Sequence, residues 1–121
     1  MNEMTIARVF PLHIHGALEA MLALALMAVA FVLGLDAPAL IASLAFGGLI
    51  LAVALATHVD DEGSLPISTH LAFDLSFAVA MAAGAVAIAA VGDAAGAILL
   101  GTAATALTLL CTLTRYSPAR G

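Results

Sequence analysis

The chain of 121 residues is 64% hydrophobic and 9% charged, a composition outside the range of soluble domains that predicts an integral membrane protein. Its net charge is −5 with only three basic residues, so the expected partner is the lipid bilayer and not nucleic acid. All three basic residues are arginines and the chain has one cysteine, which excludes a lysine Schiff base and an intramolecular disulfide.

Four apolar runs are long enough to cross the membrane as helices, since about 30 Å of hydrocarbon takes about 20 helical residues. Each run is continuous, whereas the strands of a membrane β-barrel would alternate apolar and polar residues. We therefore predict an all-α integral membrane protein with a single transmembrane domain over 1–121. Its four transmembrane helices form an up-down-up-down bundle, with spans over 12–35, 37–58, 66–91 and 94–114.

The first run opens with two histidines and then places an acid inside the bilayer. His15 and Glu19 are four residues apart, so on a helix they share one face and lie one turn from each other. His13 lies about 200° around the helix from His15. We therefore expect His13 at the membrane interface and treat it as an additional candidate only.

The second run ends at His58 and leads into an acidic loop that contains Asp60. Both residues fall on the same side of the membrane as His15, so they are also additional candidates for a site there. Several small residues permit close approach of helices and predict a homodimer through small-residue helix faces. These are Gly47, Gly48, Gly84, Gly92 and Gly96.

The third run repeats the pattern of the first, because His70 precedes Asp74 by four residues, 55 positions after the first pair. In an up-down-up-down chain these two runs point the same way, so both pairs lie at one depth. We interpret the similarity as an internal repeat of a two-helix unit, over 15–58 and 70–112. Parallel repeats are related by a pseudo-two-fold axis along the membrane normal, which would bring the two pairs together.

The fourth run carries three threonines on one stripe, which we expect to pack between helices or to bond to carbonyls of their own helix: Thr105, Thr108 and Thr112. The three arginines set the orientation, because Arg8, Arg115 and Arg120 fall on one side of a four-span bundle. By the positive-inside rule both termini are cytoplasmic. The two histidine–acid pairs then lie at the cytoplasmic ends of the first and third helices.

This layout resembles small bacterial four-helix membrane proteins built from two copies of a His-x-x-x-acid helix, akin to the SPW-repeat proteins. The resemblance covers residues from about 12 to 115. The Ser-Pro-Trp signature is absent, because the chain has no tryptophan and Ser117-Pro118 falls after the last helix. The resemblance implies the fold and a bacterial inner (plasma) membrane location, and it implies no activity.

We favour a transition-metal site among the chemical interpretations, since imidazole and carboxylate groups bind zinc, iron and manganese ions. Two helices that each offer both ligand types can form a four-ligand site from His15, Glu19, His70 and Asp74. Haem b is less favoured. His15 and His70 would be its axial ligands, and the carboxylate one turn from each histidine would lie against the porphyrin face.

Two other interpretations stay open at this point. In proton-coupled transport of a small cation, Glu19 or Asp74 holds a proton in the membrane and releases it when the cation binds. In a structural membrane subunit without a cofactor, the four groups form only a polar clasp between helices, with His15 facing Asp74 and Glu19 facing His70. The sequence places no nucleophile beside a base, so we do not expect an enzyme.

Overall fold

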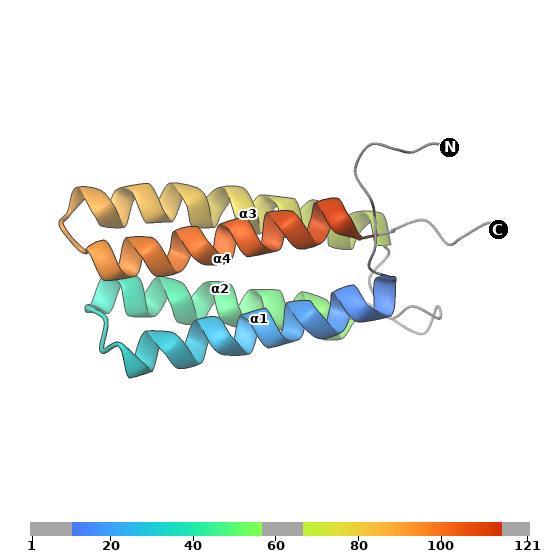
Figure 1. Cartoon of the computed structure of the whole chain (residues 1–121), viewed down its shortest axis with the longest axis horizontal. Coiled ribbons are helices and arrows are strands. Elements are labelled where there is room, and N and C mark those ends of the chain that lie inside the picture. Colours follow the sequence, from blue (N-terminus) through green and yellow to red (C-terminus); the bar gives the residue numbers. More distant parts are fainter. Residues whose placement is uncertain (1–10, 57–66, 115–121) are drawn as a thin grey trace.

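The computed structural model describes residues 11–56 and 67–114, and within these two ranges the chain forms a bundle of four helices (Figure 1). All four helices are long and apolar enough to cross a membrane. The predicted all-α, four-helix membrane bundle is therefore confirmed. The helices are α1 (Leu12–Val32), α2 (Ala37–Ala56), α3 (Ile67–Ala90) and α4 (Ala94–Leu113).

Two glycine turns fold the chain into helical hairpins. Gly34 and Gly92 follow α1 and α3 with φ angles of 62° and 91°, a left-handed conformation that costs glycine least. After the first turn the N–H of Leu35 donates to the carbonyl of Ala30 at 3.3 Å, a bond typical of a helix that ends in this way. Asp93 then caps α4, since its Oδ1 accepts from the N–H of Gly96 at 2.9 Å. Each turn therefore reverses the chain within a few residues.

The arrangement of the helices places α1 and α3 on one diagonal of the bundle. Most contacts lie within the hairpins, α1 with α2 and α3 with α4, and the hairpins then join through α1 with α4 and α2 with α3. The helices α2 and α4 also touch across the other diagonal. In the described ranges no Cα atom of α1 lies within 8 Å of a Cα atom of α3. Only long side chains can therefore connect α1 with α3.

The close diagonal contact lies where α2 and α4 begin. A Cβ atom built on Gly96 would lie 2.6 Å from the Cβ of Ala39, which is itself fully buried. Gly47 is also buried and faces Met27 of α1. These two glycines therefore serve packing inside one chain, and the homodimer through small-residue faces stays a prediction.

The buried residues of α1 and α3 follow one spacing. His15, Glu19, Ala23 and Leu26 are buried on α1, and the residues 55 positions later are buried on α3. This common spacing supports the predicted repeat, which stays a prediction. The two stripes make the interior polar at one end and apolar along the rest, where the largest fully buried apolar side chains are Leu26, Ile50, Met81, Leu100 and Leu107.

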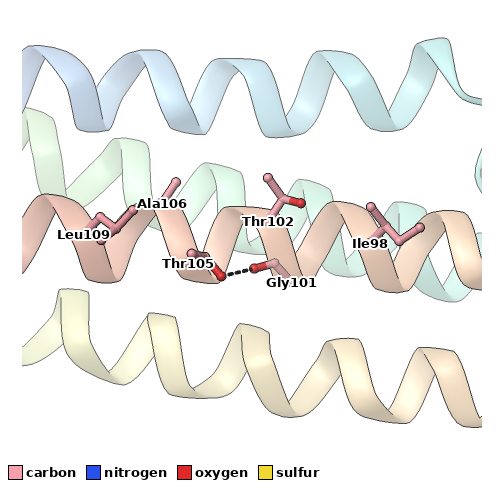
Figure 2. A pocket seen from close by; sticks show the side chains of 6 residues that line it. All are labelled: Ile98, Gly101, Thr102, Thr105, Ala106 and Leu109. Atoms are coloured by element: carbon pink, nitrogen blue, oxygen red, sulfur yellow. Dashed lines mark hydrogen bonds between the residues drawn. The ribbon is translucent and has the colours of Figure 1, made fainter.

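The outer face of α4 carries a shallow groove lined by small residues, threonines and two large aliphatic side chains (Figure 2). Thr105 Oγ1 donates to the carbonyl of Gly101 at 2.9 Å within the same helix. Thr108 and Thr112 bond in the same way to carbonyls of α4. The hydroxyl groups of the three threonines therefore bond to carbonyls of their own helix, as expected from the sequence. The groove is lined by Ile98, Gly101, Thr102, Thr105, Ala106 and Leu109.

Candidate metal centre

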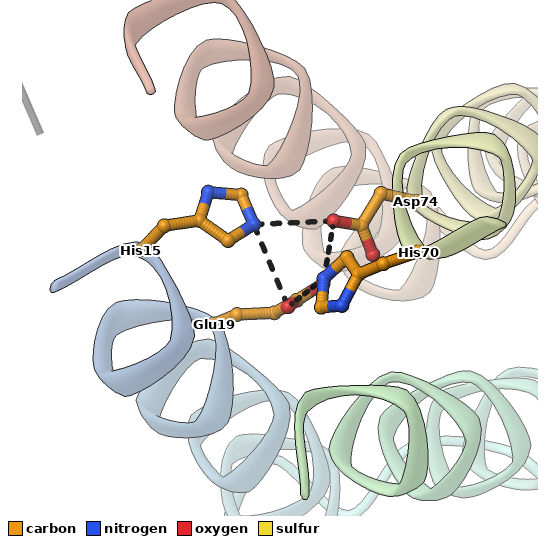
Figure 3. A group of neighbouring side chains, drawn as sticks. All are labelled: His15, Glu19, His70 and Asp74. Atoms are coloured by element: carbon orange, nitrogen blue, oxygen red, sulfur yellow. Dashed lines mark hydrogen bonds and ion pairs between the residues drawn. The ribbon is translucent and has the colours of Figure 1, made fainter. Parts of the chain in front are cut away.

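The candidate site lies in the first turns of α1 and α3. His15 comes three residues after the first residue of α1, and His70 holds the same place in α3. Glu19 and Asp74 follow one turn deeper. Because the two helices run in the same direction, both pairs lie at one level and point at each other across the diagonal (Figure 3). The structure brings together all four residues, and each side chain is at most 3% exposed.

The four side chains form a closed ring in which imidazole nitrogens and carboxylate oxygens alternate. Across the diagonal, His15 Nε2 lies 3.2 Å from Asp74 Oδ2, and His70 Nε2 lies 2.8 Å from Glu19 Oε1. Along each helix, His15 Nε2 lies 3.6 Å from Glu19 Oε1, and His70 Nε2 lies 3.0 Å from Asp74 Oδ2. The pairs expected from the sequence, His15 with Asp74 and Glu19 with His70, are therefore the pairs that the structure contains.

The size of the ring is close to that of the coordination sphere of a small metal ion. The four atoms that could bind an ion, one from each residue, all lie within 4.8 Å of one another. Four nitrogen and oxygen ligands at about 2.0–2.2 Å from a tetrahedral ion are roughly 3.3–3.6 Å from each other. The four sides of the ring are 2.8, 3.0, 3.2 and 3.6 Å. Three of these sides are shorter than the spacing around a tetrahedral ion, so the side chains would have to move slightly apart for one ion to bind all four groups.

Hydrogen bonds alone satisfy this ring poorly. Each Nε2 atom can carry one proton at most, yet each faces a carboxylate oxygen on both sides. The second oxygens of the two acids, Glu19 Oε2 and Asp74 Oδ1, are buried and have no hydrogen-bond partner among the residues that the structure describes. A buried polar atom without a partner costs about 1–3 kcal/mol. The cluster therefore has more acceptors than donors, as a cation-binding site does.

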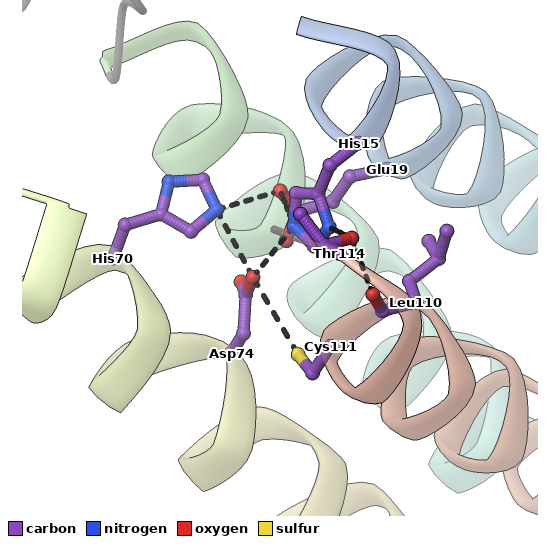
Figure 4. Close-up of polar contacts among 7 residues, drawn as sticks. All are labelled: His15, Glu19, His70, Asp74, Leu110, Cys111 and Thr114. Carbon is purple, nitrogen blue, oxygen red and sulfur yellow. Dashed lines mark hydrogen bonds and ion pairs between the residues drawn. The ribbon is translucent and has the colours of Figure 1, made fainter. Parts of the chain in front are cut away.

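The last turn of α4 forms a further side of the site (Figure 4). Thr114 Oγ1 lies 2.7 Å from Nδ1 of His15 and donates to the carbonyl of Leu110 at 2.5 Å. The thiol of Cys111 donates to Asp74 Oδ2 at 3.9 Å. The sequence interpretation missed both residues. Their signal is positional, because Cys111 and Thr114 continue the buried stripe that passes through Leu107.

Of the three additional candidates, only His13 lies within the residues that the structure describes. His13 is exposed on the outer side of α1, as its position on the helix predicts. His58 and Asp60 lie outside the described residues. Among the described residues, the site consists of the two helical pairs with support from the C-terminal end of α4.

The interior beyond the ring is apolar. The next buried residues toward the far end of α1 and α3 are Ala23, Leu26, Ala78 and Met81, each at most 5% exposed. Among the described residues, Ser43 is the one buried polar side chain outside the end that holds the ring. Apart from Ser43, the buried polar side chains of the described residues are therefore confined to one end of the bundle.

The chemistry open to this cluster is the binding of a cation by two imidazoles and two carboxylates, in an apolar bundle suited to a membrane. The four helices by length and composition indicate an integral membrane protein. Comparison of the chain with protein families, with curated proteins and with solved structures gives no match, so inference of function depends on the geometry of the site.

Proposed function

We propose that the protein binds one divalent transition-metal ion between α1 and α3. The ligand atoms are Nε2 of both histidines and one oxygen of each acid: His15, Glu19, His70 and Asp74. The observation that carries the proposal is the convergence of two nitrogen and two oxygen ligand atoms from two helices whose Cα atoms do not come within 8 Å of each other in the described ranges. Zn²⁺, Fe²⁺ and Mn²⁺ accept such a mixed set of ligands.

The charge of the ligands favours a divalent ion. Metal ligands are deprotonated, so the imidazoles are neutral and the two acids together carry two negative charges. A divalent ion cancels these charges. A monovalent or trivalent ion would leave a net charge inside an apolar bundle, where charge is costly.

Haem fits this arrangement poorly. Glu19 Oε1 lies 2.8 Å from one histidine nitrogen and 3.6 Å from the other, so it sits between the two axial candidates, His15 and His70. Asp74 Oδ2 does the same at 3.0 and 3.2 Å. A porphyrin between the two histidines would have to displace both carboxylates, so we favour a single non-haem ion.

Proton-coupled transport of a cation is the second interpretation, with Glu19 or Asp74 as the transport acid. A transport pathway needs polar groups or water along the bundle. Apart from Ser43, the buried side chains described beyond the ring are apolar, and Leu26 and Met81 are 2% and 0% exposed. This supports binding at one end of the bundle over passage through it.

A polar clasp without any ion is the third interpretation, and the same four contacts would form it. The excess of carboxylate oxygens over donors favours an ion over the clasp. We also propose that the ring lies on the cytoplasmic side of a bacterial inner membrane. The positions of Arg8, Arg115 and Arg120 in the sequence and the SPW-repeat-like layout support this location.

The experiment is metal analysis of protein purified in mild detergent, stripped with a chelator and equilibrated with Zn²⁺, Mn²⁺ or, without oxygen, Fe²⁺. We expect one ion per chain and no Soret band in the absorption spectrum. The variants Glu19→Gln and Asp74→Asn keep the shape and a hydrogen-bonding oxygen but lose the charge. Each should weaken binding by more than roughly tenfold, since even changes outside the ligand set cost 10- to 100-fold.

The control variant is His13→Ala, which changes an exposed histidine of the same helix and should bind as the wild type does. Folded wild-type protein that retains no stoichiometric ion would overturn the proposal in favour of the clasp. Equal binding by the wild type and the two amide variants would place the ion elsewhere in the protein.

A further inference from the structure

Thr114 lies at the point where α4 ends and contacts the ring through one histidine. We infer that Thr114 is a positioning residue of the metal centre, which determines the ring nitrogen that His15 presents to the ion; this inference rests on the proposed function. Thr114 is fully buried beside His15. It is the C-cap residue of α4, a helix that supplies none of the four ligands.

The position of Thr114 follows from the end of its helix. The last residue of α4 is Leu113, and Thr114 has an extended backbone with φ −97° and ψ 140°. The last four carbonyls of a helix lack the usual partner one turn ahead, and Leu110 is one of these residues. The hydroxyl of Thr114 donates to the carbonyl of Leu110 at 2.5 Å. The single hydroxyl proton of Thr114 is therefore used in this bond, because a carbonyl oxygen can only accept a hydrogen bond.

The direction of the second hydrogen bond follows from the first. Thr114 Oγ1 lies 2.7 Å from Nδ1 of His15, and with its proton directed at Leu110 the oxygen must accept from this nitrogen. The Nδ1 atom of His15 therefore carries a proton. In a neutral imidazole the lone pair is then on Nε2, the atom that faces the ring (Figure 4).

This chain of two hydrogen bonds is the arrangement that metal centres use around a histidine ligand. The nitrogen that does not bind the ion donates to a fixed acceptor, which sets the tautomer and the orientation of the imidazole. At this site the chain runs from His15 through Thr114 to a backbone carbonyl that α4 holds in place. Without the hydroxyl, the imidazole of His15 could rotate or present Nδ1 to the ion. The ion would then lose a ligand whose orientation and tautomer are already correct before it binds.

The test compares three threonine variants in the full-length protein. Thr114→Val removes the hydroxyl and keeps the shape, and Thr114→Ser keeps the hydroxyl. Thr112→Val is the matched control, because the Thr112 hydroxyl bonds to Leu109 on the same turn and not to the ring. Zn²⁺ and Co²⁺ affinity is measured in detergent by competition with a chromophoric chelator.

We expect Thr114→Val to lower the affinity by about 10- to 100-fold, the usual effect of removing such a supporting group. Thr114→Ser should restore most of the affinity, and Thr112→Val should match the wild type. Histidine ¹⁵N spectra of the zinc-loaded protein give a readout that a merely structural role would not change. They should show Nε2 of His15 bound to zinc and Nδ1 protonated in the wild type, with this pattern lost in Thr114→Val.

Several results would overturn the inference. Unchanged affinity and an unchanged His15 signal in Thr114→Val would remove the role of Thr114 and leave the proposed function intact. Wild-type protein that binds neither Zn²⁺ nor Co²⁺ would overturn both the role of Thr114 and the proposed function. Should Thr114→Val fail to fold, the wild-type spectrum decides alone, because zinc on Nδ1 of His15 contradicts the inference and zinc on Nε2 with a protonated Nδ1 supports it.

Discussion

The Nε2 atom of His70 lies 2.8 Å from Oε1 of Glu19, although these residues belong to helices on opposite corners of the bundle. This contact explains how a carboxylate can lie inside a helix suited to the bilayer. Glu19 is held by the opposite helix more closely than by its own, since His15 Nε2 is 3.6 Å away. The two helical hairpins are thereby connected through polar side chains.

The first prediction concerns the coupling of this pair. His70→Ala and Glu19→Ala should each destabilise the protein, because each leaves a buried partner unsatisfied. The double variant should lose less unfolding free energy than the two single variants together. We expect an interaction energy of about 0.5–3 kcal/mol in a double-mutant cycle measured by unfolding in detergent. The control cycle pairs His13→Ala with Glu19→Ala and should be additive. Additivity in both cycles would contradict the contact.

The second prediction concerns stabilisation by the ion. Because the ligands come from both hairpins, an ion binds the folded bundle and not the unfolded chain. Zn²⁺ at 100 times its dissociation constant should add about 2.7 kcal/mol of stability. Thermal unfolding in detergent with and without Zn²⁺ measures this. The double variant Glu19→Gln, Asp74→Asn should show no such increase, and an equal increase there would point to binding elsewhere.

The third prediction concerns the close diagonal contact between α2 and α4. Gly96→Ala should destabilise the bundle by about 1–3 kcal/mol, the usual cost of overpacking. The reason is that the new Cβ atom would lie 2.6 Å from the Cβ of Ala39. Gly101→Ala is the matched control on the same helix, because its nearest neighbour would be the Cβ of Ala85 at an ordinary 3.9 Å. There the higher helix propensity of alanine should give a gain of up to about 1 kcal/mol.

The fourth prediction concerns topology. With Cys111→Ser as background, Asp36→Cys and Asp93→Cys should be labelled from one side of the membrane and His13→Cys from the other. The physical reason is that both acids lie in turns at the end of the bundle remote from His13. Labelling in intact cells also tests the orientation, for which we expect His13 on the cytoplasmic side. Labelling of residues 13 and 36 from the same side would contradict a span between them.

The sequence by itself determined the number of helices, their approximate ends and the level of the polar groups. These properties are local, because a bilayer requires long apolar runs and glycine ends a helix within one turn. Here α1 ends at Val32, before the apolar run ends at residue 35, because Gly34 takes a left-handed conformation. His15 and Glu19 share one face because of the helical period alone, and the same holds for His70 and Asp74, which follow 55 residues later.

Only the tertiary structure decided which helices are diagonal, which glycines face inward and which residues of α4 reach the ring. In a soluble bundle the boundary between apolar and polar side chains marks the buried face of each helix. Lipid is as apolar as the interior, so the sequence of a membrane helix carries no such boundary, and packing sets its rotation. Thr114 and Cys111 reach the site because α4 runs back toward the first turns of α1 and α3 and is rotated so that these two residues face inward. Their contacts, with His15 and Asp74, join residues that are far apart in the chain.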